Sequence, residues 1–200
     1  MSTLLTEVGL LSYDSYLKKF DNWVKESGTS SSDSTPDKIE FTKLNWARTQ
    51  RIHHTIVLSE TLKKEILRLT HTYSWIVLTE AWCGDSAQNL PVIAEIARLN
   101  PDKIKLNILL RDENPEFIDN YLTNGSRAIP KLVCIDETIN REGFVWGPRP
   151  AAAQELLTQW KNEPGGKSWD DFEKELHSWY AKNKTQDIQK EFEGLLNILI

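Results

Sequence analysis

Cysteine is scarce in this chain of 200 residues, which has only two, Cys83 and Cys134. Two cysteines so far apart do not make the dense disulfide framework of a small secreted domain. We therefore expect the protein to work in a reducing compartment, the cytoplasm.

Long apolar runs and an excess of basic residues are also missing. No stretch approaches the roughly 18 apolar residues of a membrane-spanning helix, so we expect no contact with a membrane. The chain has 24 Lys and Arg against 29 Asp and Glu, a net charge of −5, which excludes the basic footprint of a nucleic-acid-binding protein. The start, residues 1–7, has neither a basic segment nor a long apolar one, and we expect no secretory signal.

Histidine is sparse too, with four residues in the chain. His53 and His54 are adjacent and would point to different faces of a helix. Neither they nor His71 has a cysteine or carboxylate beside it at a ligand spacing. We therefore expect neither a metal site nor another cofactor.

The N-terminal part, residues 1–54, is predicted to be helical. Apolar residues spaced by three or four between Leu11 and Lys25 indicate an amphipathic helix. Residues 27–38 form a Ser-rich stretch without an apolar residue, which is typical of a flexible linker. A second helix is expected to start near Glu40.

The middle part, residues 55–163, alternates between helix and strand patterns. Helices are expected at 58–69, 86–99, 115–122 and 150–160 or 161, and strands at 75–81, 104–110, 131–135 and 143–146. This order, α-β-α-β-α-β-β-α, predicts an α/β domain with a mixed sheet that helices cover on both faces.

The C-terminal part, residues 164–200, follows a turn that contains Pro164 and two glycines. Ser168 is a typical N-cap, and the apolar spacing beyond it predicts two amphipathic helices. Their apolar stripe, and that of the N-terminal helix, is interpreted as docked core rather than as a groove for a partner, because amphipathic helices normally bury their own stripe.

One motif carries recognisable chemistry. The sequence WCGDS at residues 82–86 lies between a buried strand and a helix, which places Cys83 at or just before a helix N-terminus. The free N–H groups and the helix dipole at such a position favour a thiolate. A second signal is Ile129-Pro130, a proline directly before a strand.

These residues and the element order resemble the thioredoxin family over about residues 72–162. The stretches TEAWCGDSAQNLPVI and WGPRPAAAQEL, with the C-terminal tail, are similar to a bacterial branch that has extra terminal helices. The resemblance implies a thioredoxin-like domain at 55–163 with helical extensions at both ends. It also implies a cis Ile129–Pro130 bond packed opposite Cys83.

The sequence departs from the family pattern at three positions. Ser86 replaces the second cysteine, so a mixed disulfide on Cys83 has to be released by an external thiol. Asp85 replaces a proline, and a carboxylate there raises the pKa of the thiol. Val77 stands where thioredoxins have a buried carboxylate for proton transfer; Glu80 is a substitute by position, although a glutamate at a strand end is more often solvated.

Cys134 is predicted to be a core thiol. It follows Pro130 by four residues in a strand, which puts it on the order of 13 Å from that proline. A disulfide needs Cα atoms about 4.4–6.8 Å apart, so Cys134 does not replace the missing cysteine.

Two features near the motif have two readings each. Arg149 either supplies a cation to Cys83, to Asp85 or to an anionic ligand, or belongs to a Pro-Arg-Pro segment that only starts a helix, with Pro150 at its first position. Trp146 either forms an apolar rim with Trp82 and Pro130 that grips a peptide, or lies half-buried in the sheet.

Two functions follow from this reading. The first is a monothiol protein of cell redox homeostasis, in which Cys83 exchanges with disulfides of proteins or small thiols. The second is a non-catalytic thioredoxin-fold module that binds a protein. The candidate catalytic residues are Cys83, Ser86 and Pro130, and the candidate binding residues are Trp82, Gly84, Asp85, Ile129 and Arg149.

Overall fold

The structure, a computed structural model, describes residues 9–200; the start considered above as a possible signal lies outside them. Its centre is a five-stranded sheet with the order β1-β3-β2-β4-β5. The strands are β1 (Leu11–Ser12), β2 (Tyr73–Thr79), β3 (Ile104–Leu110), β4 (Lys131–Asp136) and β5 (Arg141–Trp146). β2 and β3 are parallel and the other three pairs antiparallel, so the predicted mixed sheet is confirmed.

The helices follow the predicted order. They are α1 (Tyr13–Lys25), α2 (Pro36–Thr55), α3 (Glu60–Leu67), α4 (Gly84–Leu99), α5 (Pro115–Ile118), α6 (Ala151–Asn162), α7 (Trp169–Asn183) and α8 (Gln186–Asn197). α2 begins before the expected Glu40, because Thr35 caps it and Pro36 occupies its first position. α5 ends before the expected residue 122, because tight i→i+3 hydrogen bonds to Phe117 and Ile118 close it.

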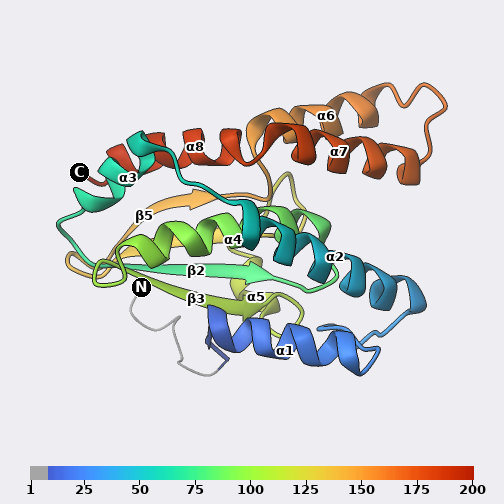
Figure 1. The fold of residues 1–200 in the computed structure, drawn as a ribbon, viewed down its shortest axis with the longest axis horizontal. Helices are drawn as coiled ribbons and strands as arrows, with labels where there is room; N and C mark the ends of the chain where they lie inside the picture. The colour runs from blue at the N-terminus through green and yellow to red at the C-terminus, as the bar shows by residue number, and fades with distance from the viewer. Residues whose placement is uncertain (1–8) are drawn as a thin grey trace.

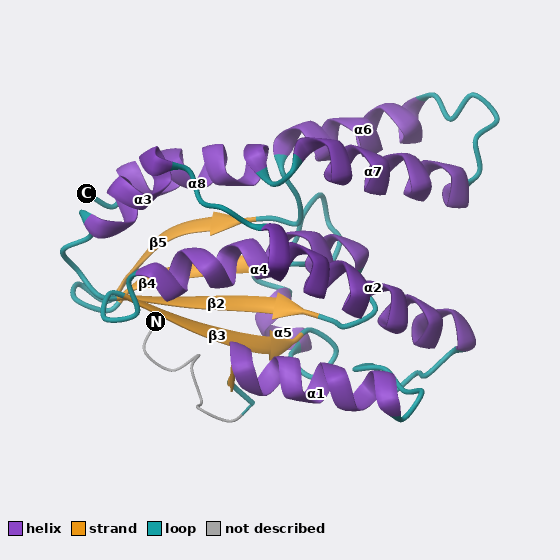
Figure 2. Cartoon of the chain, viewed as in Figure 1, coloured by secondary structure: helices purple, strands orange, loops and turns teal. Residues whose placement is uncertain are grey.

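The sheet is covered on both faces, but unequally (Figures 1 and 2). Alternate residues of β2 point to opposite faces. Trp75 and Val77 join the large cluster that α1, α3, α4 and α8 cover, while Ile76 and Leu78 join a smaller one that includes Ile118 of α5. Burial on both faces explains the continuous apolar run at residues 75–78 of β2.

The Ser-rich segment is not a free linker, which corrects the expectation of flexibility. Thr29 and Ser31 are buried. The Ser30 hydroxyl donates to the Glu80 carboxylate and accepts from the Ala81 N–H, and the Ser31 hydroxyl donates to Asp112 at 3.0 Å. Hydroxyl groups therefore anchor a segment that has no apolar side chain to bury.

The C-terminal helices pack on the rest of the chain, as predicted from their stripes. Phe192 of α8 packs against Trp75 of β2 and Trp146 of β5. Phe172 of α7 packs against Trp160 of α6, and Figure 1 shows these two helices side by side beyond the end of the sheet.

Within residues 9–200, none of the helices combines the length and the apolar character that crossing a membrane requires.

Candidate thiol site

Cys83 is the N-cap residue of α4 and directly follows the turn after β2. Its Sγ donates a hydrogen bond to the Ile129 carbonyl oxygen at 3.3 Å. The Ile129–Pro130 bond is cis, the conformation that the resemblance implied. The fold thus brings Cys83 to the Ile129–Pro130 segment, which is more than forty residues away in sequence.

The thiol is held in its protonated form. Burial is the main cause that raises the pKa of Cys83 to about 11, and the Asp85 carboxylate adds to it. The hydroxyl and backbone N–H of Ser86 and the Arg149 guanidinium act in the opposite direction but are weaker. The helix N-terminus therefore does not produce a thiolate here, which corrects that expectation and agrees with the predicted effect of Asp85.

Asp85 is held in a buried ion pair. The side chains of Asp85 and Arg149 are each 10% exposed, and Arg149 donates to Asp85 Oδ2 through Nε at 3.1 Å and through a terminal nitrogen. Of the two readings of Arg149, the pairing with Asp85 is the one observed. Pro150 is the N-cap of α6 and not its first helical residue, a difference of one position.

Glu80 is fully buried, not solvated as a strand-end glutamate usually is. Burial raises the pKa of Glu80, while hydrogen bonds from Ser30 and from the Asp112 N–H act against this rise. Its carboxylate is occupied by these two donors, so it ties residues 30 and 112 to the end of β2. Val77 is buried in the core.

Ser86 is 2% exposed, and its Oγ has no partner at ordinary hydrogen-bond geometry. A thiolate is a stronger acceptor than a thiol. The Ser86 hydroxyl would therefore interact most strongly with Cys83 after the thiol ionises.

The two tryptophans take different roles. Trp82 is half-buried, with the Lys38 ammonium 5.3 Å and the Arg111 guanidinium 4.8 Å from its ring centre. Trp146 is buried, and its Nε1 donates to Glu191 of α8 at 2.6 Å. The rim reading of Trp146 is therefore wrong, because α8 covers its ring; it lies in the sheet, and is more buried than expected.

Cys134 is a core thiol, as predicted. It is fully buried in β4 opposite Trp75, and both cysteines are free. Burial is the main cause that raises the pKa of Cys134 to about 12.

α7 contributes residues that the sequence did not mark as part of the site. Tyr180 donates to Asp85 Oδ1 at 2.7 Å, and His177 Nδ1 lies 3.0 Å from Gln88 Nε2. A Cβ on Gly84 would lie 2.7 Å from His177 Nε2, so this glycine allows α7 to pack closely against the first turn of α4. The only sequence signal for these contacts is the apolar stripe of α7, which does not indicate the element against which α7 packs.

The histidines have other partners. His71 pairs with Asp136 at 2.6 Å, and His53 bonds the Tyr13 hydroxyl at 2.8 Å. Among the described residues, no three His, Cys, Asp or Glu side chains gather as metal ligands would.

Two solved structures share the fold. One is a protein of unknown function from Pseudomonas aeruginosa, 19% identical with a TM-score of 0.56; the match covers 94% of this chain and 98% of that one. The other is an HIV epitope scaffold, 19% identical with a TM-score of 0.53 and the same coverage. At this identity the likeness concerns the fold alone. No curated protein sequence gives a significant match.

A family model described as thioredoxin matches residues 33–161, which is more than half of the chain. The match includes the Cys83 turn, Pro130 and the four larger strands. It begins within the Ser-rich segment and so takes in α2, which the sequence pattern had assigned to the N-terminal extension. The chain therefore belongs to the thioredoxin-like family.

Proposed function

We propose that this protein captures partners as mixed disulfides through the single thiol of Cys83. The observation that carries the proposal is the placement of Sγ, 3.3 Å from the Ile129 carbonyl oxygen at the start of α4. A partner disulfide that reaches Sγ would lie beside Pro130 and near the buried Arg149, whose charge favours the thiolate. We propose that this exchange takes place in the reducing cytoplasm.

The reaction balances with one external thiol. Cys83 loses its proton to solvent, and its sulfur attacks one sulfur of the partner disulfide. A Cys83–partner disulfide forms, the partner's S–S bond breaks, and the second sulfur leaves as a thiolate that takes up a proton. Because Ser86 has no thiol, one external thiol must then attack the mixed disulfide to free Cys83.

The raised pKa of Cys83 favours a slow reaction of the thiol. With a pKa of about 11, a small fraction of the thiol is ionised at neutral pH. Slow capture of one partner fits this state better than rapid turnover does.

A second candidate is a non-catalytic binding module, in which Cys83 is only packed. The same burial and raised pKa favour it. In this case the surface around Trp82 would recognise a protein, and the thiol would not react.

Incubation with glutathione disulfide separates the two candidates. A Cys134→Ala variant reports on Cys83 alone, and a Cys83→Ser variant serves as its control. We expect mass spectrometry to show one glutathione adduct on the first variant and none on the second. Below the pKa, the adduct should form about ten times faster for each unit by which the pH is raised, and excess dithiothreitol should remove it.

The binding candidate predicts a different result in the same experiment. If folded Cys134→Ala forms no adduct up to pH 9 while the same chain in urea does, Cys83 is not an exchange thiol. The binding candidate would then stand, and partner capture with Cys83→Ser should equal that of the unchanged protein.

A further inference from the structure

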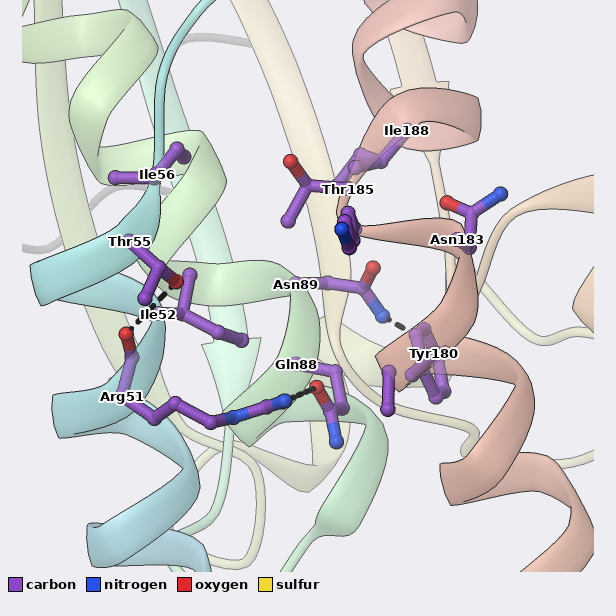
Figure 3. Close-up of a pocket in the computed structure, with 12 residues that line it drawn as sticks. Arg51, Ile52, Thr55, Ile56, Gln88, Asn89, Tyr180, Asn183, Thr185 and Ile188 are labelled. Carbon is purple, nitrogen blue, oxygen red and sulfur yellow. Dashed lines mark hydrogen bonds between the residues drawn. The ribbon is translucent and has the colours of Figure 1, made fainter.

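A cavity of about 360 Å³ lies between α2, the first half of α4, and the turn from α7 to α8. Its volume falls within the roughly 300–1,000 Å³ that small-molecule sites occupy. Figure 3 shows its walls, with Arg51 on α2, Asn89 on α4 and Tyr180 on α7. It adjoins the thiol site, since Tyr180 lines it and donates to Asp85, but neither Cys83 nor Pro130 lines it.

The charged residues of its wall have one sign. Arg51 and Lys184 line the cavity, and none of the twelve described lining residues is acidic. This is unusual in a chain with a net charge of −5. Arg51 donates to the neutral Gln88 amide at 3.2 Å, so an anion in the cavity would meet a guanidinium not neutralised by a carboxylate of the wall.

Asn89 lies at the floor and has one polar atom without a partner. Its Nδ2 donates both to the Asp85 backbone carbonyl at 2.9 Å and to the Tyr180 hydroxyl at 3.0 Å. Because the Tyr180 hydroxyl uses its own proton on Asp85, it can only accept from Asn89, which fixes the orientation of the amide. Asn89 Oδ1 is then left buried without a hydrogen bond, and Figure 3 shows it directed away from Tyr180.

Apolar side chains complete the wall. Ile52 and Ile188 are buried, and Ile56 is half-buried. The cavity therefore combines two cations, one acceptor that lacks a donor, and a branched aliphatic surface. A ligand ammonium would be repelled by Arg51 and Lys184, so the matching donor is a neutral O–H or N–H group.

We propose that this cavity binds a small aliphatic carboxylate that carries a neutral hydrogen-bond donor, such as a branched 2-hydroxy acid. The carboxylate pairs with Arg51 and Lys184, the donor reaches Asn89 Oδ1, and the aliphatic group packs on Ile52, Ile56 and Ile188. The site does not depend on the proposed function of Cys83.

Three matched probes test the proposal by isothermal titration with the full chain. They are 2-hydroxy-4-methylpentanoate, 4-methylpentanoate, which lacks the donor, and 2-hydroxy-4-methylpentanamide, which lacks the charge. We expect saturable one-to-one binding of the first, about fivefold weaker binding of the second, and at least tenfold weaker binding of the neutral amide.

Variants locate the site. Arg51→Gln and Lys184→Gln should each weaken the hydroxy acid about threefold to fivefold. Lys190→Gln removes the same charge from an exposed position of α8 outside the cavity and should leave binding unchanged. Because Arg51, Lys184 and Lys190 are exposed, we expect all three variants to fold. Circular dichroism checks that they do.

Three results would overturn the proposal. They are no saturable binding of the hydroxy acid, equal binding of all three probes, or equal weakening by Lys190→Gln and by the two cavity variants. The last would show nonspecific attraction to positive charge.

Discussion

Tyr180, three residues before the end of α7, donates a hydrogen bond of 2.7 Å to Asp85 Oδ1 in the first turn of α4. The other carboxylate oxygen of Asp85 binds Arg149 from the loop before α6. One carboxylate beside the thiol thus joins the C-terminal extension to the family domain. Asp85, one of the positions where the sequence departs from the pattern expected for the family, is therefore one attachment point of α7.

Replacing this carboxylate should make the thiol more acidic. In Asp85→Asn the repulsion of a Cys83 thiolate disappears while the Arg149 charge stays, so the pKa of Cys83 falls, yet it remains above its ordinary value because burial persists. We expect alkylation of Cys83 at pH 8, followed by mass spectrometry, to become about tenfold faster. Asp171→Asn, an exposed change in the first turn of α7, is the control and should have no effect. An unchanged rate in Asp85→Asn would show that Asp85 does not act on the thiol.

Removing the Tyr180 hydroxyl should loosen the attachment of α7. In Tyr180→Phe the buried Asp85 loses one donor and Asn89 loses one acceptor. We expect the free energy of unfolding in urea to fall by about 2 kcal/mol. Tyr121→Phe removes an exposed hydroxyl that binds Glu142 and should cost less than about 0.5 kcal/mol. Equal losses in the two variants would contradict the role given to Tyr180.

The sequence predicted those parts of the fold that depend on local pattern. The strand at 104–110 has the expected bounds, and the helix after Cys83 begins within two residues of the expected start. The motif also placed Cys83 near Pro130 through the family resemblance. Local patterns decide these features because apolar periodicity and helix caps act over a few residues.

The contacts that decide the chemistry were not predictable in this way. Tyr180 meets Asp85 across 95 positions of sequence, and Ser30 meets Glu80 across 50. From sequence alone a serine-rich segment is expected to be flexible. It is held in place here because its hydroxyl groups meet carboxylate acceptors. The protonated state of Cys83 likewise depends on burial, which arises from residues as distant as Ile129.

Two glycines should respond in opposite ways to the same substitution. Gly147 has φ +109°, and a Cβ there would lie 2.2 Å from the Pro130 carbonyl oxygen, so Gly147→Ala should lower the free energy of unfolding by more than about 3 kcal/mol. Gly194 lies inside α8 with open space around it, and Gly194→Ala should raise stability by roughly 0.5–1 kcal/mol. Denaturant unfolding measures both changes. A stable Gly147→Ala protein would mean that the backbone beside Pro130 is free to move.

His177 should make the stability of the protein depend on pH. Burial, followed by the charges of Arg48, Arg51 and Arg149, lowers the pKa of His177 to about 3. Between that value and the ordinary pKa of about 6.5, the unfolded chain binds a proton that the folded chain does not, so stability falls as the pH falls through this window.

The partial exposure of His177 reduces this effect, and we expect a loss of about 1 kcal/mol between pH 7 and pH 5. His177→Gln should remove most of this slope, whereas His54→Gln, at an exposed position of α2, should keep it. Urea unfolding at four pH values measures the slope. A His177→Gln protein that loses as much stability as the unchanged chain would assign the pH dependence to other groups, of which His53, with its pKa lowered mainly by burial, is the first to test.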